Sequence, residues 1–153
     1  MYRLTLLIPP ALLLIVFATM MWLIGVFFPF LSLNQERQLW VPLLIIMAGI
    51  FLIIMSSITF VRLKTTLNPM KPESSSTLIK TGLYRYSRNP IYLGLAVILF
   101  GWGVYLSNIL TLLFLVGFVL YLNRFQIEPE EKSLEQRFGV QFEEYKHKVR
   151  RWL

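Results

Sequence analysis

Three long stretches of the chain carry no charged residue, and their lengths predict helices that cross a membrane. They cover residues 4–33, 39–61 and 91–123. A helix needs about 20 apolar residues to cross the hydrocarbon core of a bilayer, and all three stretches are long enough. Gly101 and Gly103 lie inside the third stretch, where small residues allow membrane helices to pack closely. The chain is therefore predicted to be an integral membrane protein of the all-α class.

The third stretch is too long for a single crossing. As one helix it would extend about 50 Å, against a hydrocarbon core of about 30 Å. Ser107 and Asn108 lie near its middle, and both residue types favour turns. We therefore expect two short helices, at 91–106 and 109–122, which makes about four transmembrane helices in total. Because each is short for a full crossing, we expect tilt or local thinning of the bilayer.

The basic residues predict the orientation of these helices. The chain is 56% hydrophobic, yet it has 15 Lys and Arg and a formal net charge of +7. With four crossings, Arg37 is the only basic residue that falls on the side opposite the two termini. The positive-inside rule then places both termini in the cytoplasm, and we expect the inner membrane of a prokaryote. The charge is interpreted as a topology signal with attraction to anionic lipid headgroups, not as a nucleic-acid-binding surface.

A charged tail, residues 123–153, repeats apolar residues at spacings typical of a helix. The repeat consists of Ile127, Leu134, Phe138, Phe142, Tyr145, Val149 and Trp152. We predict an amphipathic helix on the cytoplasmic surface. Glu130 and Glu131 interrupt the apolar face between its first two members, and a carboxylate there is costly unless it meets a cation or hydrogen-bond donors. The two glutamates therefore mark a candidate site.

A second candidate lies at the entrance to the third apolar stretch. Pro90 suits the first turn of a helix, and Asn89 before it suits the N-cap. The free backbone N–H groups at such an entrance favour an anion, and Arg88 adds positive charge. Tyr84 and Tyr92 add flat surfaces with polar edges. A plain aromatic belt with cytoplasmic anchors explains the same residues equally well, so both interpretations stay open.

The acidic residues of the tail also have two interpretations. Pro129 fits a first helical position, and acidic residues in a first turn complement the helix dipole. On that reading Glu128, Glu130 and Glu131 only begin a helix. The functional reading rests on their place on the apolar face, beside Arg124 at a membrane exit. The absence of cysteine excludes disulfides and thiolate ligands, and no metal site is predicted.

Together these two segments resemble a known family. Residues 82–94 resemble the G-x-Y-x-x-x-R-[HN]-P-x-Y-x-G signature of isoprenylcysteine carboxyl methyltransferases and related phospholipid methyltransferases. Residues 130–145 resemble that family's second signature, E-E-x-x-L-x-x-x-F-G-x-x-[YF]-x-x-Y. The resemblance covers about residues 65–153. It departs at Asn89, because the carboxyl-methylating branch usually has His there.

The resemblance implies an integral membrane methyltransferase that uses S-adenosylmethionine. The cofactor-binding residues that it implies are Tyr84, Arg88, Asn89, Pro90, Tyr92, Glu130 and Glu131. The catalytic candidates are Arg88, Asn89 and Arg124, with the arginines orienting an anionic acceptor and no general base assigned. The chain is treated as one domain, in which residues 1–61 form a two-helix scaffold and residues 62–153 bind the cofactor.

The acceptor and the competing functions are less determined. A lipid or small apolar molecule is expected as acceptor, methylated on oxygen, nitrogen or sulfur. Membrane sterol reductases, which bind NADPH, have a related-looking C-terminal region and are one alternative. A non-enzymatic membrane scaffold subunit is the other. The oligomeric state stays open.

Overall fold

All regular structure in the computed structural model is helical over the residues that it describes, 8–29, 39–63 and 77–153. The elements are α1 (Pro10–Phe27), α2 (Trp40–Arg62), the 3-10 helix η3 (Gly82–Arg85), α3 (Pro90–Leu106), α4 (Thr111–Tyr121), the π-helix η4 (Leu122–Ile127), α5 (Glu128–Phe138) and α6 (Val140–Lys148). The all-α prediction is confirmed. The predicted loop that holds Arg37 lies outside the described residues.

The described helices form a bundle able to span a membrane. α1, α2 and the continuous helix Thr111–Phe138 are long and apolar enough to cross, and α3 is a shorter apolar helix. Large side chains on the outside of the bundle, such as Trp40, Leu44 and Leu113, are 76%, 68% and 68% exposed. Such faces are typical of helices surrounded by lipid, so the predicted membrane bundle is confirmed.

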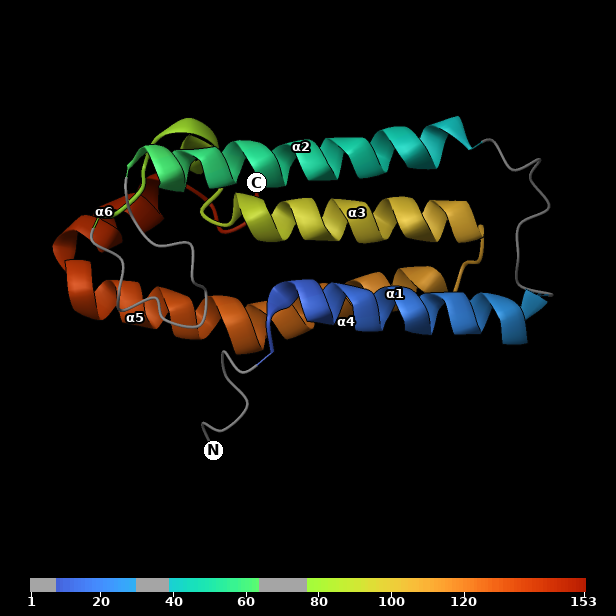
Figure 1. The fold of residues 1–153 in the computed structure, drawn as a ribbon. Coiled ribbons are helices and arrows are strands. Elements are labelled where there is room, and N and C mark those ends of the chain that lie inside the picture. Colours follow the sequence, from blue (N-terminus) through green and yellow to red (C-terminus); the bar gives the residue numbers. More distant parts are fainter. Residues whose placement is uncertain (1–7, 30–38, 64–76) are drawn as a thin grey trace.

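The helices are arranged so that distant parts of the sequence meet at one end. α2 and α3 lie side by side, and α1 packs with α4 on the other side of α3 (Figure 1). The α3–α4 turn is at one end of the bundle. η3, α5, α6 and the C-terminus gather at the other end, near the beginning of α3. This end brings the two candidate segments of the sequence together.

Glycines allow α2 and α3 to pack with their backbones in contact. A Cβ atom on Gly94 would lie 2.7 Å from the carbonyl oxygen of Gly49 and 2.6 Å from Cγ1 of Ile53. Farther along α3, a Cβ on Gly101 would lie 3.1 Å from the carbonyl oxygen of Pro42. The predicted packing role of small residues in this helix is confirmed. Because α3 begins at the candidate site, this contact also positions the site.

Gly94→Ala should destabilise the fold. The new methyl group meets a backbone carbonyl, which cannot move aside as a flexible side chain can, so we expect a loss of about 1–3 kcal/mol, typical of overpacking. Thermal unfolding in lipid nanodiscs measures the change. Gly25→Ala is the matched control, because among the described residues its Cβ would meet only Leu106 Cδ2, at 3.9 Å. Equal melting temperatures for the two variants would contradict the close contact.

The turn between α3 and α4 confirms the predicted division of the third apolar stretch. Contrary to the expectation for 109–122, the second helix is not short, because it continues from Thr111 to Phe138 and is long enough to cross. Ser107 adopts a left-handed conformation with φ 51°. The Asn108 side chain accepts a hydrogen bond from the Leu110 N–H and donates one to the carbonyl of Phe28, each at 3.0 Å. Asn108 is buried, so the turn is fastened inside the protein to the end of α1.

The tail differs from the single amphipathic helix expected from its periodicity. α4 continues without a break through η4 into α5, which gives one helix of 28 residues, Thr111–Phe138. That helix is about 42 Å long and exceeds the hydrocarbon core. α5 carries charges on six of its eleven residues, so it projects beyond the membrane. Gly139, with φ 49°, then separates α5 from α6, because this conformation interrupts a helix.

Candidate active site

A cavity of about 330 Å³ lies where the beginning of α3 faces α5 and α6. Its polar wall contains Tyr84, Arg88, Asn89, Tyr92, Glu130 and Glu131. Its apolar wall includes Pro10, Ala11, Ile53, Phe60, Leu95, Leu134 and Phe142. α1 and α2 therefore line the cavity as well, although the sequence predicts them only as a scaffold. One side of the cavity is formed by membrane helices and the other by charged helices.

The entrance of α3 is built from a proline and a side chain that faces away from the helix. Pro90 occupies the first turn, as predicted. Asn89 holds the N-cap position but makes no side-chain cap, which corrects the expected capping role. Its amide Nδ2 donates instead to the carbonyl of Arg151 at 3.0 Å, and its backbone N–H donates to Ser87 Oγ at 3.1 Å. The Asn89 side chain thus leaves the first-turn N–H groups of α3 to other partners.

The position of α5 removes the physical basis of the capping interpretation. α5, whose first turn carries Glu128, Glu130 and Glu131, follows the π-helix η4 directly, and the residue before α5, Ile127, is itself helical. The dipole effect acts at the free end of a helix, and α5 has no free N-terminus. A π turn holds one more residue than an α turn, and such turns are frequent at functional sites. The two cavity glutamates lie in the first turn of α5, which follows the π-helix.

Glu130 is a carboxylate that faces the cavity, where Tyr92 is its hydrogen-bond donor. Tyr92 OH donates a hydrogen bond to its Oε2 at 3.0 Å. Over the described part of the chain Glu130 forms no ion pair. Burial raises the pKa of Glu130 to about 7, while the Tyr92 hydrogen bond opposes that rise and the neighbouring charge of Glu131 adds to it. An acid with this pKa is poised to ionise when a cation arrives.

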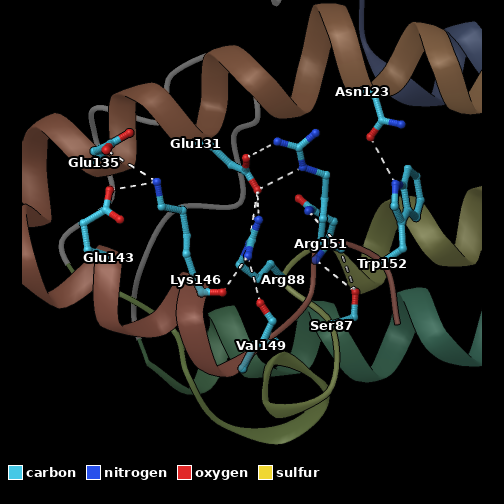
Figure 2. A network of polar contacts seen from close by, with 11 residues as sticks. Ser87, Arg88, Asn123, Glu131, Glu135, Glu143, Lys146, Val149, Arg151 and Trp152 are labelled. Carbon is cyan, nitrogen blue, oxygen red and sulfur yellow. Dashed lines mark hydrogen bonds and ion pairs between the residues drawn. The ribbon is translucent and has the colours of Figure 1, made fainter.

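Glu131, in contrast, is saturated by two arginines (Figure 2). Its Oε1 accepts from Arg88 Nη2 at 2.8 Å and from Arg88 Nε at 3.1 Å. Its Oε2 accepts from Arg151 Nη2 at 2.6 Å, and Arg151 Nε reaches Oε1 at 3.3 Å. The Glu131 side chain is only 13% exposed. The adjacent glutamates therefore differ in role: one is neutralised inside the protein and the other is open to a ligand.

Arg88 is held almost entirely by the protein. Besides its two bonds to Glu131, its Nη1 donates to the carbonyls of Val149 and Lys146, at 2.8 and 3.2 Å. These bonds use four of the five N–H groups of a guanidinium. The Arg88 side chain is 12% exposed and still touches the cavity. Arg88 therefore acts first as a clamp on the residues after α6, with one Nη2 N–H left over.

The structure brings most of the predicted site residues to one place. Six of the predicted residues line the cavity, and Ser57, Thr77 and Tyr145 add polar groups that were not predicted. Pro90 is buried as the start of α3 and does not line the cavity. Arg124 lies outside, because its side chain is 71% exposed and pairs with Glu128 at 2.8 Å. Its position gives no support to the predicted role of Arg124 in orienting an acceptor.

Several residues that build the site were not among the predicted site residues. Arg151 pairs with Glu131, and Trp152 Nε1 donates to Asn123 Oδ1 at 3.0 Å. Tyr145 OH donates to the carbonyl of Tyr84 at 2.6 Å, which ties α6 to η3. The apolar repeat does include Tyr145 and Trp152, so periodicity found that they are inward-facing. The apolar periodicity does not predict the ion pair of Arg151, because that pair depends on how the chain runs back toward α5 after α6.

Comparison with known families agrees with this architecture. The sequence profile of the phospholipid methyltransferase family matches residues 37–141. This match covers more than half of the chain and both segments of the polar wall. The chain therefore belongs to the phospholipid methyltransferase family.

Individual relatives share this region. An uncharacterized protein of Haemophilus influenzae is 48% identical over 63 residues, which are 41% of this chain and 100% of that protein. The protein-S-isoprenylcysteine O-methyltransferase of Saccharomyces cerevisiae is 42% identical over 84 residues, 52% of this chain and 33% of the yeast enzyme. The Xenopus laevis enzyme of the same name is 42% identical over 78 residues, 49% of this chain and 26% of the frog enzyme. No solved structure matches.

Proposed function

We propose that this protein transfers a methyl group from S-adenosylmethionine to a lipid-like or small apolar acceptor in the membrane. The observation that carries the proposal is Glu130, a carboxylate in a partly apolar cavity that has a hydrogen-bond donor but, among the residues that the structure describes, no cationic partner. Such a group calls for a cationic ligand. Family membership supports a methyltransferase, and the cofactor and acceptor are our inference.

The residues of the cavity fit the parts of this cofactor. Glu130 suits an ammonium or hydroxyl group, and the rings of Tyr84 and Tyr92 suit a sulfonium. The beginning of α3, with Asn89 turned aside, suits a carboxylate. The cofactor would supply a methyl group activated by a positive sulfur. The protein's own contribution is to orient this methyl group toward the acceptor and to exclude water.

The apolar wall supports a membrane-dissolved acceptor. Ala11 in α1, Ile53 and Phe60 in α2 and Leu95 in α3 border the cavity, and all belong to the apolar helices. An acceptor with a hydrocarbon part can therefore lie against the membrane side while its reactive atom meets the polar wall. The acceptor atom is oxygen, nitrogen or sulfur. The side chain of Asn89 is engaged with the C-terminal segment, so we assign it a structural role and no proton transfer.

Binding of S-adenosylmethionine to the purified protein in lipid nanodiscs tests the proposal. We expect saturable binding by isothermal titration calorimetry and a higher melting temperature with the cofactor present. Stabilisation by NADPH but not by S-adenosylmethionine would favour the reductase alternative. If neither molecule binds, in lipid as well as in detergent, the enzyme proposal fails. Incubation with lipid extracts and labelled S-adenosylmethionine, followed by mass spectrometry, then identifies the acceptor.

A further inference from the structure

The residues after α6 form a short extended segment against the entrance of α3. Val149 has extended dihedral angles, φ −129° and ψ 130°. The backbone N–H of Arg88 donates to the carbonyl of Arg150 at 3.0 Å, and Asn89 Nδ2 donates to the carbonyl of Arg151. We call residues 149–152 the C-terminal strap. Its backbone is fixed on one side to the residues that precede α3.

Two side chains fix the strap on its other side (Figure 2). Arg151 reaches Glu131 on α5, and Trp152 reaches Asn123 on η4, as described above. The strap therefore connects the α3 entrance to the long helix that carries the two glutamates. Glu130 in α5 and Asn89 at the N-cap of α3 both line the cavity, and the strap connects these two elements.

We propose that Arg151 is a positioning residue, which holds α5 against the α3 entrance through Glu131 and thereby sets the cofactor side of the cavity. The inference rests on the proposed function for what the cavity binds. It adds that a residue outside the cavity determines how well the cavity binds. Arg151 is absent from the cavity lining, so its effect must pass through its partner.

Arg151 is needed in addition to Arg88 because the two arginines contact Glu131 differently. Both hydrogen bonds from Arg88 go to the same oxygen, Oε1. Within the described part of the chain, Oε2 accepts from Arg151 alone. A carboxylate held at both oxygens has a defined orientation, whereas one held at a single oxygen can rotate. Loss of Arg151 therefore loosens α5 while the Arg88 contact remains.

Three variants distinguish the geometry of the Arg151 contact from the presence of its charge. Arg151→Gln removes the charge and the paired donors, and Arg151→Lys keeps the charge but lacks the planar fork of a guanidinium. Arg150→Gln is the matched control, since it removes the same charge one residue earlier. The Arg150 side chain is exposed and forms no ion pair among the described residues, and its contact to Arg88 uses only the backbone.

Calorimetry with S-adenosylmethionine in nanodiscs gives the first readout. We expect Arg151→Gln to raise the dissociation constant about tenfold, the effect of losing a hydrogen-bonded charge contact. Arg151→Lys should restore part of this loss, and Arg150→Gln should bind as the unchanged protein does. If Arg151→Gln binds no more weakly than Arg150→Gln, the positioning role is wrong.

Hydrogen exchange gives a second readout that does not need the cofactor. In Arg151→Gln we expect faster exchange at the Arg88 amide, whose acceptor is in the strap, with unchanged exchange in α2 and α3. Equal exchange at Arg88 in the Arg151→Gln and Arg150→Gln variants would overturn the inference. Faster exchange throughout α2 and α3 would also overturn it, because Arg151 would then serve general stability. If the unchanged protein binds no S-adenosylmethionine, the proposed function fails and exchange alone decides the role of Arg151.

Discussion

Glu131→Ala is expected to cost about 3 kcal/mol or more of unfolding free energy, as is typical when one partner of a buried ion pair is removed. The Arg88 and Glu131 side chains are 12% and 13% exposed. Removal of the carboxylate leaves the guanidinium of Arg88 buried beside two backbone carbonyls with no negative charge, and it also releases Arg151. Thermal or denaturant unfolding in a fixed lipid or detergent environment measures the loss.

Glu128→Ala is the matched control for this effect. Glu128 lies on the same helix and also pairs with an arginine, Arg124, but that arginine is 71% exposed. Exposed ion pairs contribute about 0–1 kcal/mol, so the control should change little. If the two variants unfold alike, the Glu131 cluster does not stabilise the fold in the way the geometry indicates.

In contrast to Glu131→Ala, Glu130→Gln should leave the fold stable and weaken cofactor binding. The amide keeps an acceptor for the Tyr92 hydroxyl but cannot attract a cation. We expect the dissociation constant for S-adenosylmethionine to rise roughly 10- to 100-fold, in line with the loss of a charged hydrogen-bond partner. Calorimetry measures the binding and a thermal melt measures the fold. Normal cofactor affinity in this variant would remove the main support for the proposed function.

The pH dependence of binding gives this variant a second check. Burial raises the pKa of Glu130 from 4.5 to about 7, so the folded protein favours the protonated acid. Its ionisation therefore costs stability as pH rises above the ordinary value of the carboxyl, and the cost is complete above pH 7. A cationic ligand prefers the ionised form, so cofactor affinity should increase as pH rises through about 7. Glu130→Gln should lose this increase.

The different roles of Glu130 and Glu131 could not be predicted from the sequence. In the sequence they are neighbours on one interrupted apolar face, and their position predicts the same role for both. Neighbouring positions on a helix point in directions about 100° apart, because a turn holds 3.6 residues. One carboxylate consequently meets Tyr92 and the cavity, and the other meets Arg88 and Arg151. The role of each glutamate depends on partners from distant segments, and the spacing of residues along one helix does not reveal these partners.

The membrane helices were more predictable than the tail. A helix that crosses a membrane carries few charged residues because a charge in hydrocarbon is costly. The bounds of α2 and α3 therefore agree closely with the uncharged stretches of the sequence. The sequence of the tail predicts one helix because α5 and α6 share a continuous apolar repeat. Gly139 interrupts this helix with a positive φ angle. The spacing of apolar side chains does not reveal such a backbone conformation.

The sequence by itself determined that the chain is a helical membrane protein, that the third apolar stretch turns near Asn108, and which residues were candidates for one site. These features depend on local composition and on spacing along the chain. Only the tertiary structure decided which candidates meet, because hydrogen bonds and ion pairs at the site join residues up to 64 positions apart. It excluded Arg124 from the cavity, added Arg151, and turned Arg88 from a free cation into a clamp. Charge partners depend on distance in space, and in this bundle that distance is set by the close packing of α2 on α3 and by the return of the chain after α6.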